Sequence, residues 1–514
     1  MFTFLGTNFT KRSTQVSYHT LPTSSTPEIV VVSPHGHCNV QQRTRRRAPV
    51  TKRTWAAILV PVVIIYFLSE MFLLSGWRVS KSSDDPDVMY TSRSQVPDYA
   101  DLWDLEEHLP QQDLSLPQPE GRNGRFLKFE WTYTHLGFNN QLQDVLMTAH
   151  LAYLSNRAYT IQPYIWNRHS LTRVVVDKGH LRSAQIPLSA FISGPAAGTE
   201  IENNNSGNNA TVSLPPPRAV TRKFFDQVCP SRSTRIRYVD VDEVRVKYGI
   251  EEAKEPSAAQ MLEAWSKELG SIEDSCVVVR GKDYVFPFGA YGHRLAHAWP
   301  HIKDSPVFTQ HAWSPLVEGI VRNNLRVLAP DLPSAITSSS IPRMIPGLLA
   351  IHLRRGDFAR HCGRLGDMGA SFAGWANIAG LPDPLQDSWD KETTVHRCFP
   401  TVGELMKKIR TVRQEWEASV EGRGPLNRVY VLTNAEVQFR EDLTSMLIED
   451  GWDGVTMSTD LEVRREEKEV AVAADMMVAQ VAEVFLGNGW SSLTSNVNLM
   501  RMLDGAPIES NRFL

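Results

Sequence analysis

The chain has 514 residues, of which 42% are apolar and 22% are charged. This length leaves room for two or three domains, and this composition excludes a disordered or collagen-like chain. Residues 1–54 carry eight Lys or Arg against one acid, a net charge of +7, whereas the remaining residues carry 46 bases against 56 acids, or −10. Because an acidic domain is poorly suited to a nucleic-acid backbone, nucleic acid is excluded as a partner.

The first predicted element is a transmembrane helix at residues 55–77. Its 23 residues are mostly Ile, Leu, Val and Phe, and a helix of that length crosses a hydrocarbon layer of about 30 Å. Basic residues cluster just before it, so the positive-inside rule predicts a cytosolic tail at 1–54 and a far-side location for 78–514. A signal peptide and a buried core helix are the alternatives. We expect a single-pass type II membrane protein.

Features beyond the membrane segment fit a secretory lumen. Residues 78–120 are rich in Asp, Ser, Pro and Gln and predict a stem. Asn204 and Asn209 begin two glycosylation acceptor sequences in a polar tract. Four cysteines on this side allow three disulfide pairings, and we expect nearest neighbours to pair, with free thiols as the alternative. The predicted pairs are Cys229–Cys276 and Cys362–Cys398.

From residue 126 onward, apolar runs alternate with amphipathic stretches. The pattern predicts strands at 126–133, 235–239 and 276–279, with helices at 140–155, 258–269 and 315–327. After a Pro- and Ser-rich segment at 329–346, it predicts strands at 347–353, 428–433, 454–458 and 483–486. Helices are expected at 402–420, 437–448, 470–481 and 494–503. Such alternation indicates parallel, doubly wound sheets. We therefore expect two Rossmann-like domains facing one cleft, at 121–335 and 336–514.

Three polar segments follow predicted strands, where ligands bind in open α/β sheets. Residues 351–358 read Ile-His-Leu-Arg-Arg-Gly-Asp-Phe, and an arginine fork there suits a phosphate. The alternative is a structural Arg–Asp pair, for which Arg355 is the expected partner of Asp357. Residues 137–141 (Gly-Phe-Asn-Asn-Gln) and 485–494 (Phe-Leu-Gly-Asn-Gly-Trp-Ser-Ser-Leu-Thr) each lead from a glycine turn into a helix. Helix N-termini suit anionic groups, although plain helix capping is the simpler reading.

Together, these segments resemble the GDP-fucose-dependent protein O-fucosyltransferases. The family combines a Gly-aromatic-x-Asn-Gln turn, a His-x-Arg-(Arg)-x-Asp-aromatic segment and a Phe-x-Gly-Asn-x-x-Ser-Ser-[Phe/Leu]-[Ser/Thr] segment. All three occur here in this order, over roughly residues 126–503. The resemblance implies the two-domain GT-B fold, GDP-fucose as donor substrate and no metal cofactor. It also implies a Golgi or endoplasmic reticulum membrane location with a lumenal catalytic region.

The resemblance assigns roles to individual residues. It implies that Arg354 is catalytic and contacts the β-phosphate and the glycosidic oxygen, that His352 contacts the nucleotide and that Asp475 reads the guanine edge. The remaining expected contacts with GDP-fucose are Gly137, Asn139, Asn140, Gln141, Ser491, Ser492 and Leu493.

The expected reaction is fucosyl transfer to a protein Ser/Thr or glycan hydroxyl. Displacing GDP builds negative charge on the leaving phosphate, which fixed donors stabilise. Direct displacement at C1 inverts the configuration. Glu130 and His135 are candidate general bases, since no acid occupies the glycine turn where some branches of the family carry one. Trp131 and Trp166 are candidates for stacking on sugars, with core packing as the alternative.

Two other functions remain open. Asp240 and Asp242 follow an apolar run, as the Asp-x-Asp metal site of GT-A glycosyltransferases does. Under that reading the enzyme depends on a divalent metal ion. The second alternative is a catalytically silent lumenal protein that binds a sugar or nucleotide.

Overall fold

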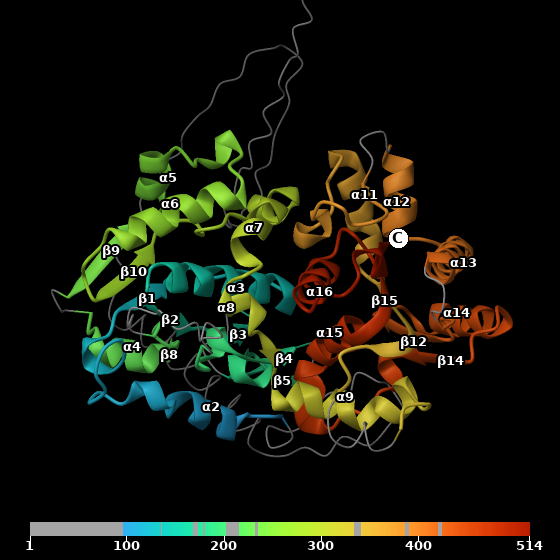
Figure 1. The fold of residues 1–514 in the computed structure, drawn as a ribbon, viewed down its shortest axis with the longest axis horizontal. Helices are drawn as coiled ribbons and strands as arrows, with labels where there is room; N and C mark the ends of the chain where they lie inside the picture. The colour runs from blue at the N-terminus through green and yellow to red at the C-terminus, as the bar shows by residue number, and fades with distance from the viewer. Residues whose placement is uncertain are drawn as a thin grey trace, which may run out of the picture. The chain divides into compact units, whose positions relative to one another are not determined.

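Two all-parallel sheets of five strands each form the centre of the fold, as the predicted α/β class requires (Figure 1). The computed structural model describes residues 96–134, 136–167, 173–177, 180–201, 215–231, 235–333, 341–385, 390–419 and 424–514. The predicted tail at 1–54, the membrane segment at 55–77, and Asn204 and Asn209 lie outside these residues. Within them, no helix combines the length and the hydropathy needed to cross a membrane.

The first sheet has the strand order β8-β2-β1-β10-β9. Its central strands β1 and β10 are mostly apolar and are buried except at Arg280, as expected for parallel strands covered on both faces. Phe126 of β1 pairs with Cys276 of β10 and Ala158 of β2. The strands are β1 (Phe126–Phe129), β2 (Ala158–Ile161), β8 (Val220–Thr221), β9 (Ile236–Asp240) and β10 (Cys276–Arg280).

Helices α3 and α6 pack against one another beside this sheet (Figure 1). A capping box formed by Ser257 and Gln260 starts α6, because each side chain bonds to the other residue's backbone N–H. Ser314 caps α9 and Pro315 occupies its first position. The helices of this half are α2 (Ala100–Glu107), α3 (Phe138–Leu154), α4 (Arg222–Val228), α5 (Val241–Tyr248), α6 (Ala258–Gly270), α7 (Trp299–Ile302), α8 (Pro306–Thr309) and α9 (Pro315–Leu328).

The second sheet has the strand order β14-β13-β12-β15-β16. Leu348 and Ala350 of β12 belong to one hydrophobic cluster, whereas Leu349 and Ile351 belong to another. This alternation shows that both faces of the central strand are buried. The strands are β12 (Ile345–Leu353), β13 (Arg428–Thr433), β14 (Gly454–Met457), β15 (Ala482–Gly487) and β16 (Asn511–Phe513).

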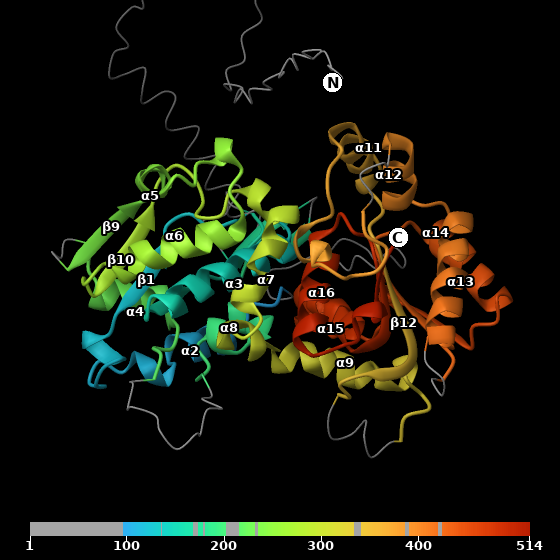
Figure 2. The same cartoon turned by 45° about the horizontal axis from the view of Figure 1, so that its top comes forward.

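Helices cover both faces of the second sheet. Figure 2 shows α13 and α14 on one side of β12, with α15 and α16 on the other. The buried residues of α13 recur at helical spacing: Leu405, Ile409, Val412 and Trp416. The helices of this half are α11 (Phe358–Met368), α12 (Lys391–Cys398), α13 (Val402–Ser419), α14 (Val437–Glu449), α15 (Ala471–Val481) and α16 (Ser492–Leu503).

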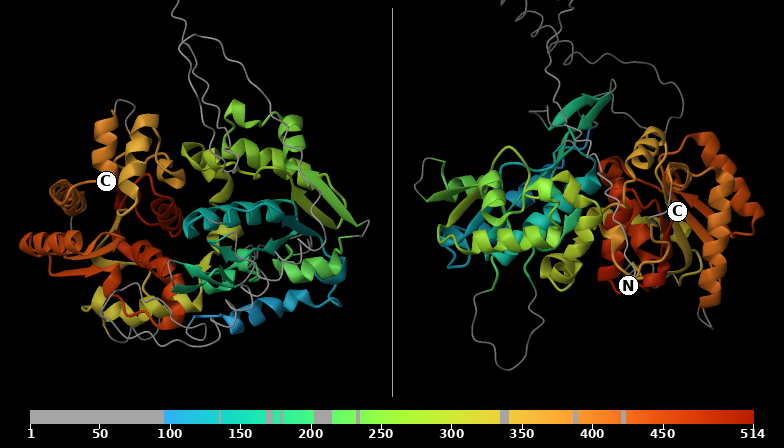
Figure 3. Two further views of the ribbon diagram at one scale, coloured as in Figure 1. Left: turned by 180° about the vertical axis from the view of Figure 1, so that it is seen from behind. Right: turned by 90° about the horizontal axis from the view of Figure 1, so that it is seen from above.

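The two sheets belong to one compact unit. Helices α3 and α16 contact each other and lie side by side in the view from behind, in teal and dark red (Figure 3). The described residues also form three short antiparallel pairs of strands outside these two sheets. They are β3 (Tyr164–Ile165) with β6 (Gln185–Ile186), β4 (Val174–Asp177) with β5 (His180–Ser183), and β7 (Ile192–Ser193) with β11 (Ala312–Trp313).

The stem predicted at 78–120 needs a correction from residue 96 onward. Residues 100–107 form α2, and the buried side chain of Gln111 donates hydrogen bonds to Gly198 O (2.9 Å) and Ala219 O (2.7 Å). Glu120 accepts two hydrogen bonds from Arg218, at 2.5 and 2.7 Å. This segment is therefore part of the folded domain, despite its polar composition.

The disulfide prediction is confirmed. Cys229 bonds to Cys276, and Cys362 bonds to Cys398. The first bridge connects the end of α4 to the start of β10, and the second connects α11 to the end of α12. The second bridge therefore holds together two segments next to the polar residues that follow β12.

Candidate functional site

His352 lies near the carboxyl end of β12 and is 4% exposed. Its Nδ1 lies 2.9 Å from Thr494 Oγ1 in α16. Burial, helped by the nearby charge of Arg354, lowers the pKa of the His352 imidazole to about 3. His352 is therefore neutral at physiological pH, with one donor and one acceptor nitrogen.

Arg354 follows β12, and its side chain is 41% exposed. Its Nη2 donates to Asp357 Oδ1 at 3.1 Å, which makes Arg354, and not Arg355, the partner of Asp357. The expected pairing was wrong because Arg355 is held elsewhere, by aromatic rings and a backbone carbonyl. The Arg354 guanidinium is thus within reach of solvent at the carboxyl edge of the sheet, where ligands bind.

The glycine loop after β15 leads directly into α16. Ser491 caps this helix, and its Oγ accepts a hydrogen bond from Leu493 N at 3.3 Å. A Cβ at Gly487 would lie 2.3 Å from Thr494 Cγ2, and one at Gly489 would lie 2.5 Å from the Phe372 ring. Both glycines therefore permit close packing, and the loop places the positive N-terminal end of α16 beside the end of β12.

The turn at residues 137–141 starts α3 and contacts α16. Asn139 is buried, and its backbone and side-chain oxygens accept hydrogen bonds from Asn496 Nδ2 at 2.8 and 3.1 Å. Gly137 caps α3 at an exposed position where an added Cβ would meet nothing. Asn140 is half-buried. The structure thus brings this turn next to the predicted phosphate-binding helix.

The structure corrects the expectation for Gln141, which has a structural role. Its Nε2 donates to Leu136 O (2.7 Å) and Ile165 O (2.8 Å), and its Oε1 accepts from Ile165 N (3.2 Å). Both amide protons and the carbonyl oxygen are therefore engaged in holding neighbouring backbone.

Asp475 lies in α15 and accepts a hydrogen bond from the Tyr430 hydroxyl at 2.5 Å. Burial raises the pKa of its carboxyl group to about 7, although the hydrogen bond from Tyr430 opposes the shift. Tyr430 is in β13, the strand next to β12 in the sheet. Burial therefore favours the neutral, protonated form of this carboxyl group.

Glu130 and the Asp-x-Asp motif lie at the ends of strands of the first sheet, β1 and β9. Glu130 is exposed directly after β1, and His135 lies outside the described residues. Asp240 caps α5 by accepting a hydrogen bond from Asp242 N at 2.9 Å. Over the described ranges, no group of three or more His, Cys, Asp or Glu side chains is arranged to hold a metal ion.

The two candidate tryptophans differ in their surroundings. Trp166 Nε1 donates to Ser183 O at 2.6 Å, and the Arg182 guanidinium lies 4.8 Å from its ring centroid. Trp131, by contrast, is 53% exposed. Trp131 therefore remains a candidate for stacking on a ligand, whereas Trp166 packs against its neighbours.

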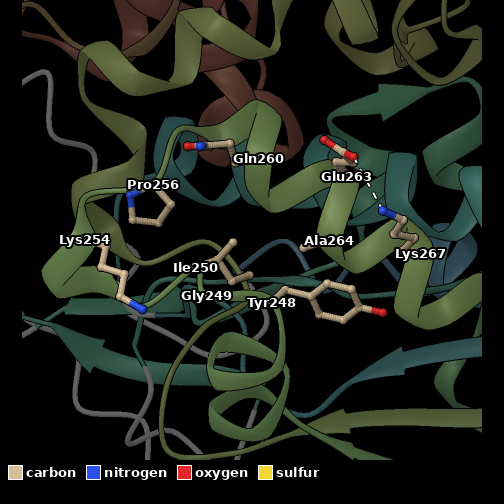
Figure 4. A pocket seen from close by; sticks show the side chains of 9 residues that line it. All are labelled: Tyr248, Gly249, Ile250, Lys254, Pro256, Gln260, Glu263, Ala264 and Lys267. Atoms are coloured by element: carbon tan, nitrogen blue, oxygen red, sulfur yellow. Dashed lines mark ion pairs between the residues drawn. The ribbon is translucent and has the colours of Figure 1, made fainter.

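Three contributors to the site carry no motif in the sequence. Asn496 joins the first-half turn to α16, Asn434 holds the backbone after β12, and Phe399 packs on Arg355. The sequence offered one signal for Asn496, which is a polar residue at a helical position that is buried. The pocket in Figure 4 lies elsewhere, between the end of α5 and α6. It has a volume of about 320 Å³ and contains none of the predicted site residues.

Comparisons with known proteins give distant matches in structure. No family model matches the chain, and no curated protein matches its sequence. POFUT1 in complex with GDP-fucose is similar with a TM-score of 0.45 and 12% identity, over 78% of this chain and 99% of that chain. NodZ alpha-1,6-fucosyltransferase soaked with GDP-fucose gives 0.34 and 12%, over 73% and 92%. A mutant of Arabidopsis thaliana FUT1 in complex with GDP gives 0.31 and 12%, over 78% and 73%.

Proposed function

We propose that the chain is an inverting fucosyltransferase that moves fucose from GDP-fucose to a hydroxyl group of a protein Ser/Thr or a glycan. One observation carries the proposal. Hydrogen bonds join His352 to Thr494 and Asn139 to Asn496, which lies in α16 just beyond the predicted segment 485–494, and Arg354 is partly exposed. Segments far apart in the sequence thus form one polar site at the carboxyl edge of the second sheet.

The groups at this site suit a nucleoside diphosphate sugar. The N-terminal end of α16, with Ser491, Ser492 and Leu493, would receive the pyrophosphate. Arg354 would hold the β-phosphate and the leaving oxygen through its planar fork. Each well-placed donor aimed at that developing charge contributes about 3 kcal/mol to transition-state stabilisation.

The reaction is a direct displacement at C1 of fucose. The acceptor oxygen forms a bond to C1 as the bond from C1 to the GDP oxygen breaks, and GDP leaves with the electron pair of that bond. The acceptor hydroxyl loses its proton to a general base. Of the two candidates, Glu130 lies in the part of the chain that the structure describes. Attack from the face opposite the leaving group inverts the configuration at C1.

The proposal includes a GT-B arrangement, with the first sheet contributing the acceptor side and the second sheet the nucleotide side. It also includes metal-independent catalysis. Asp240 supports this part, since its carboxylate already serves as the cap of α5. A GT-A enzyme would instead use Asp240 and Asp242 to hold a divalent cation on the diphosphate.

We further propose a type II orientation in the Golgi or endoplasmic reticulum membrane, with the catalytic region in the lumen. The apolar segment at 55–77 and the sequences at Asn204 and Asn209 support it. In a eukaryotic host, endoglycosidase should increase the mobility of the chain, and the C-terminus should resist added protease. Unchanged mobility together with a protease-sensitive C-terminus would refute this orientation.

A donor screen with the purified full chain tests the enzymatic proposal. Hydrolysis of GDP-fucose is compared with hydrolysis of GDP-mannose and UDP-sugars, with and without EDTA, and GDP binding is measured by calorimetry. We expect GDP binding and EDTA-resistant hydrolysis of GDP-fucose. Loss of activity in EDTA would favour the metal-dependent alternative. Failure to bind GDP would favour the alternative of a catalytically silent protein.

A further inference from the structure

The two adjacent arginines after β12 have different contacts. The Arg355 guanidinium carbon lies 3.6 Å from the ring centroid of Phe399 and 4.1 Å from that of Phe439. The guanidinium group therefore lies over both aromatic rings at contact distance. Arg354, next to it, contacts an exposed carboxylate and is itself 41% exposed. Both arginines are half-buried, but Arg355 lies close over two aromatic rings, whereas Arg354 is 5.8 Å from the Phe358 ring centroid and pairs with an exposed carboxylate.

Hydrogen bonds fix Arg355 at both ends. Its Nη1 donates to Pro400 O at 2.7 Å, and its backbone N–H donates to Asn434 Oδ1 at 2.8 Å. The next residue, Gly356, has φ +56°, and a Cβ there would lie 3.0 Å from Asn434 Nδ2. The backbone on both sides of the Arg355 side chain is therefore held against the segment after β13.

The partners of Arg355 come from three separate elements. Phe399 and Pro400 follow α12, Asn434 follows β13, and Phe439 lies in the first turn of α14. The disulfide between Cys362 and Cys398 ties α11, which begins just after this loop, to the residue before Phe399. Movement of the residues after β12 would therefore require displacing all three elements.

We infer that Arg355 is a positioning residue: its clamp between Phe399 and Phe439 holds the loop after β12 so that Arg354 points at the leaving phosphate. The inference rests on the proposed function. A lysine at position 355 would keep the charge but lose the planar group that stacks on two rings and bonds to Pro400 O. The clamp would loosen, and Arg354 would sample orientations that do not support turnover.

The test measures GDP-fucose hydrolysis by the full chain and its Arg355→Lys variant. We expect kcat to fall about tenfold or more, while the KM for GDP-fucose and the Kd for GDP change by less than about threefold. Arg360→Lys is the matched control, because Arg360 is exposed on α11 in the same part of the chain. Its kcat should stay at the wild-type value.

A double-mutant cycle separates positioning from general stability. Phe399→Leu removes one ring of the clamp and should lower kcat on its own, whereas Phe399→Tyr keeps the ring and should retain activity. Combining Phe399→Leu with Arg355→Lys should lower kcat no further than the stronger single variant, because both changes break the same clamp. Melting temperatures are recorded for every variant, so that kcat is expressed per folded molecule.

The outcomes are distinct. Normal kcat per folded molecule in Arg355→Lys, or additive losses in the cycle, would overturn the inference while the fucosyltransferase proposal stands. A wild-type chain that neither binds GDP nor hydrolyses GDP-fucose would refute the proposed function, and the positioning role would fall with it.

Discussion

His352 Nδ1 and Thr494 Oγ1 lie 2.9 Å apart, although 142 residues separate them in the chain. The bond joins the end of the central strand to the first turn of α16, in the half of the chain that ends in β16. Because the imidazole is buried and neutral, this contact fixes the orientation of the ring. It also brings the predicted histidine and serine segments into direct contact.

The pKa of Asp475, raised to about 7 by burial, predicts a pH dependence of nucleotide binding. The ring N–H and amino group of guanine donate hydrogen bonds, so they bind the ionised carboxylate. GDP affinity should therefore rise about tenfold from pH 6 to pH 8. Calorimetry across this range measures the effect, and Asp475→Asn should remove it. A pH profile that Asp475→Asn leaves unchanged would exclude Asp475 from nucleotide binding.

The raised pKa of Asp475 should affect stability in the opposite direction: stability should fall as the pH rises. The folded chain retains the Asp475 proton above the ordinary carboxyl pKa, whereas the unfolded chain loses it. The contribution to stability is therefore complete below about pH 4 and is lost as the pH rises through about 7. Denaturant titrations of the wild type and Asp475→Asn at several pH values should show this loss in the wild type alone.

The segment before the first sheet should contribute to the stability of the fold. A fragment of residues 121–514 lacks the buried side chain of Gln111, so two carbonyl oxygens lose their hydrogen bonds, and it also lacks the core residue Tyr99. We expect its free energy of unfolding to be lower by about 3 kcal/mol or more than that of residues 81–514. Equal denaturation midpoints for the two fragments would show that this segment is a spacer after all.

Trp131 should contribute to acceptor binding. It is 53% exposed just after β1, while Tyr133, two residues later, is buried and stacks on Tyr284 with ring centroids 3.9 Å apart. A large aromatic face exposed next to an anchored residue is typical of a binding surface.

Trp131→Ala should raise the acceptor KM about tenfold in transfer assays with glycan acceptors, with little change in the donor KM. Leu105→Ala is the control, because Leu105 is equally exposed on α2. An unchanged acceptor KM for Trp131→Ala would assign acceptor binding to other residues.

Four of the five strands of the second sheet could be predicted from the sequence, and β13 has the predicted bounds, Arg428–Thr433. Parallel strands buried on both faces appear as continuous apolar runs, which give a strong signal. The polar segment around α2 gave no such signal, because its contacts with residues 198 and 219 are made by Gln111. The short strands β2, β8 and β16 were missed for lack of a sustained pattern.

The predicted site shows a similar limit. Glycine turns and polar residues after strands indicated three segments, and α16 makes hydrogen bonds to residues of the other two. Sequence spacing could not tell which of two adjacent arginines pairs with Asp357, because the choice depends on Phe399 and Phe439. It also could not show that Gln141 is engaged by Ile165. Contacts between residues far apart in the chain decide these roles.

Arg354→Lys tests the proposed chemistry most directly. Lysine keeps the positive charge but loses the planar fork, so it cannot hold the β-phosphate and the leaving oxygen together. The affinity for GDP should fall modestly, because α16 and Asp475 remain. Turnover of GDP-fucose should fall by about 10²-fold or more, because the lost contact strengthens as charge develops on the leaving group.

The position of Arg354 makes the outcome specific. Its side chain is 41% exposed, and its hydrogen bond is to Asp357, whose side chain is 75% exposed, so the substitution should change the melting temperature little. Steady-state kinetics, GDP calorimetry and thermal denaturation on one preparation separate binding, turnover and folding. Near-normal turnover in a folded Arg354→Lys variant would remove Arg354 from the mechanism. The proposal would then lose its main physical support, since no other cation in the predicted site carries this role.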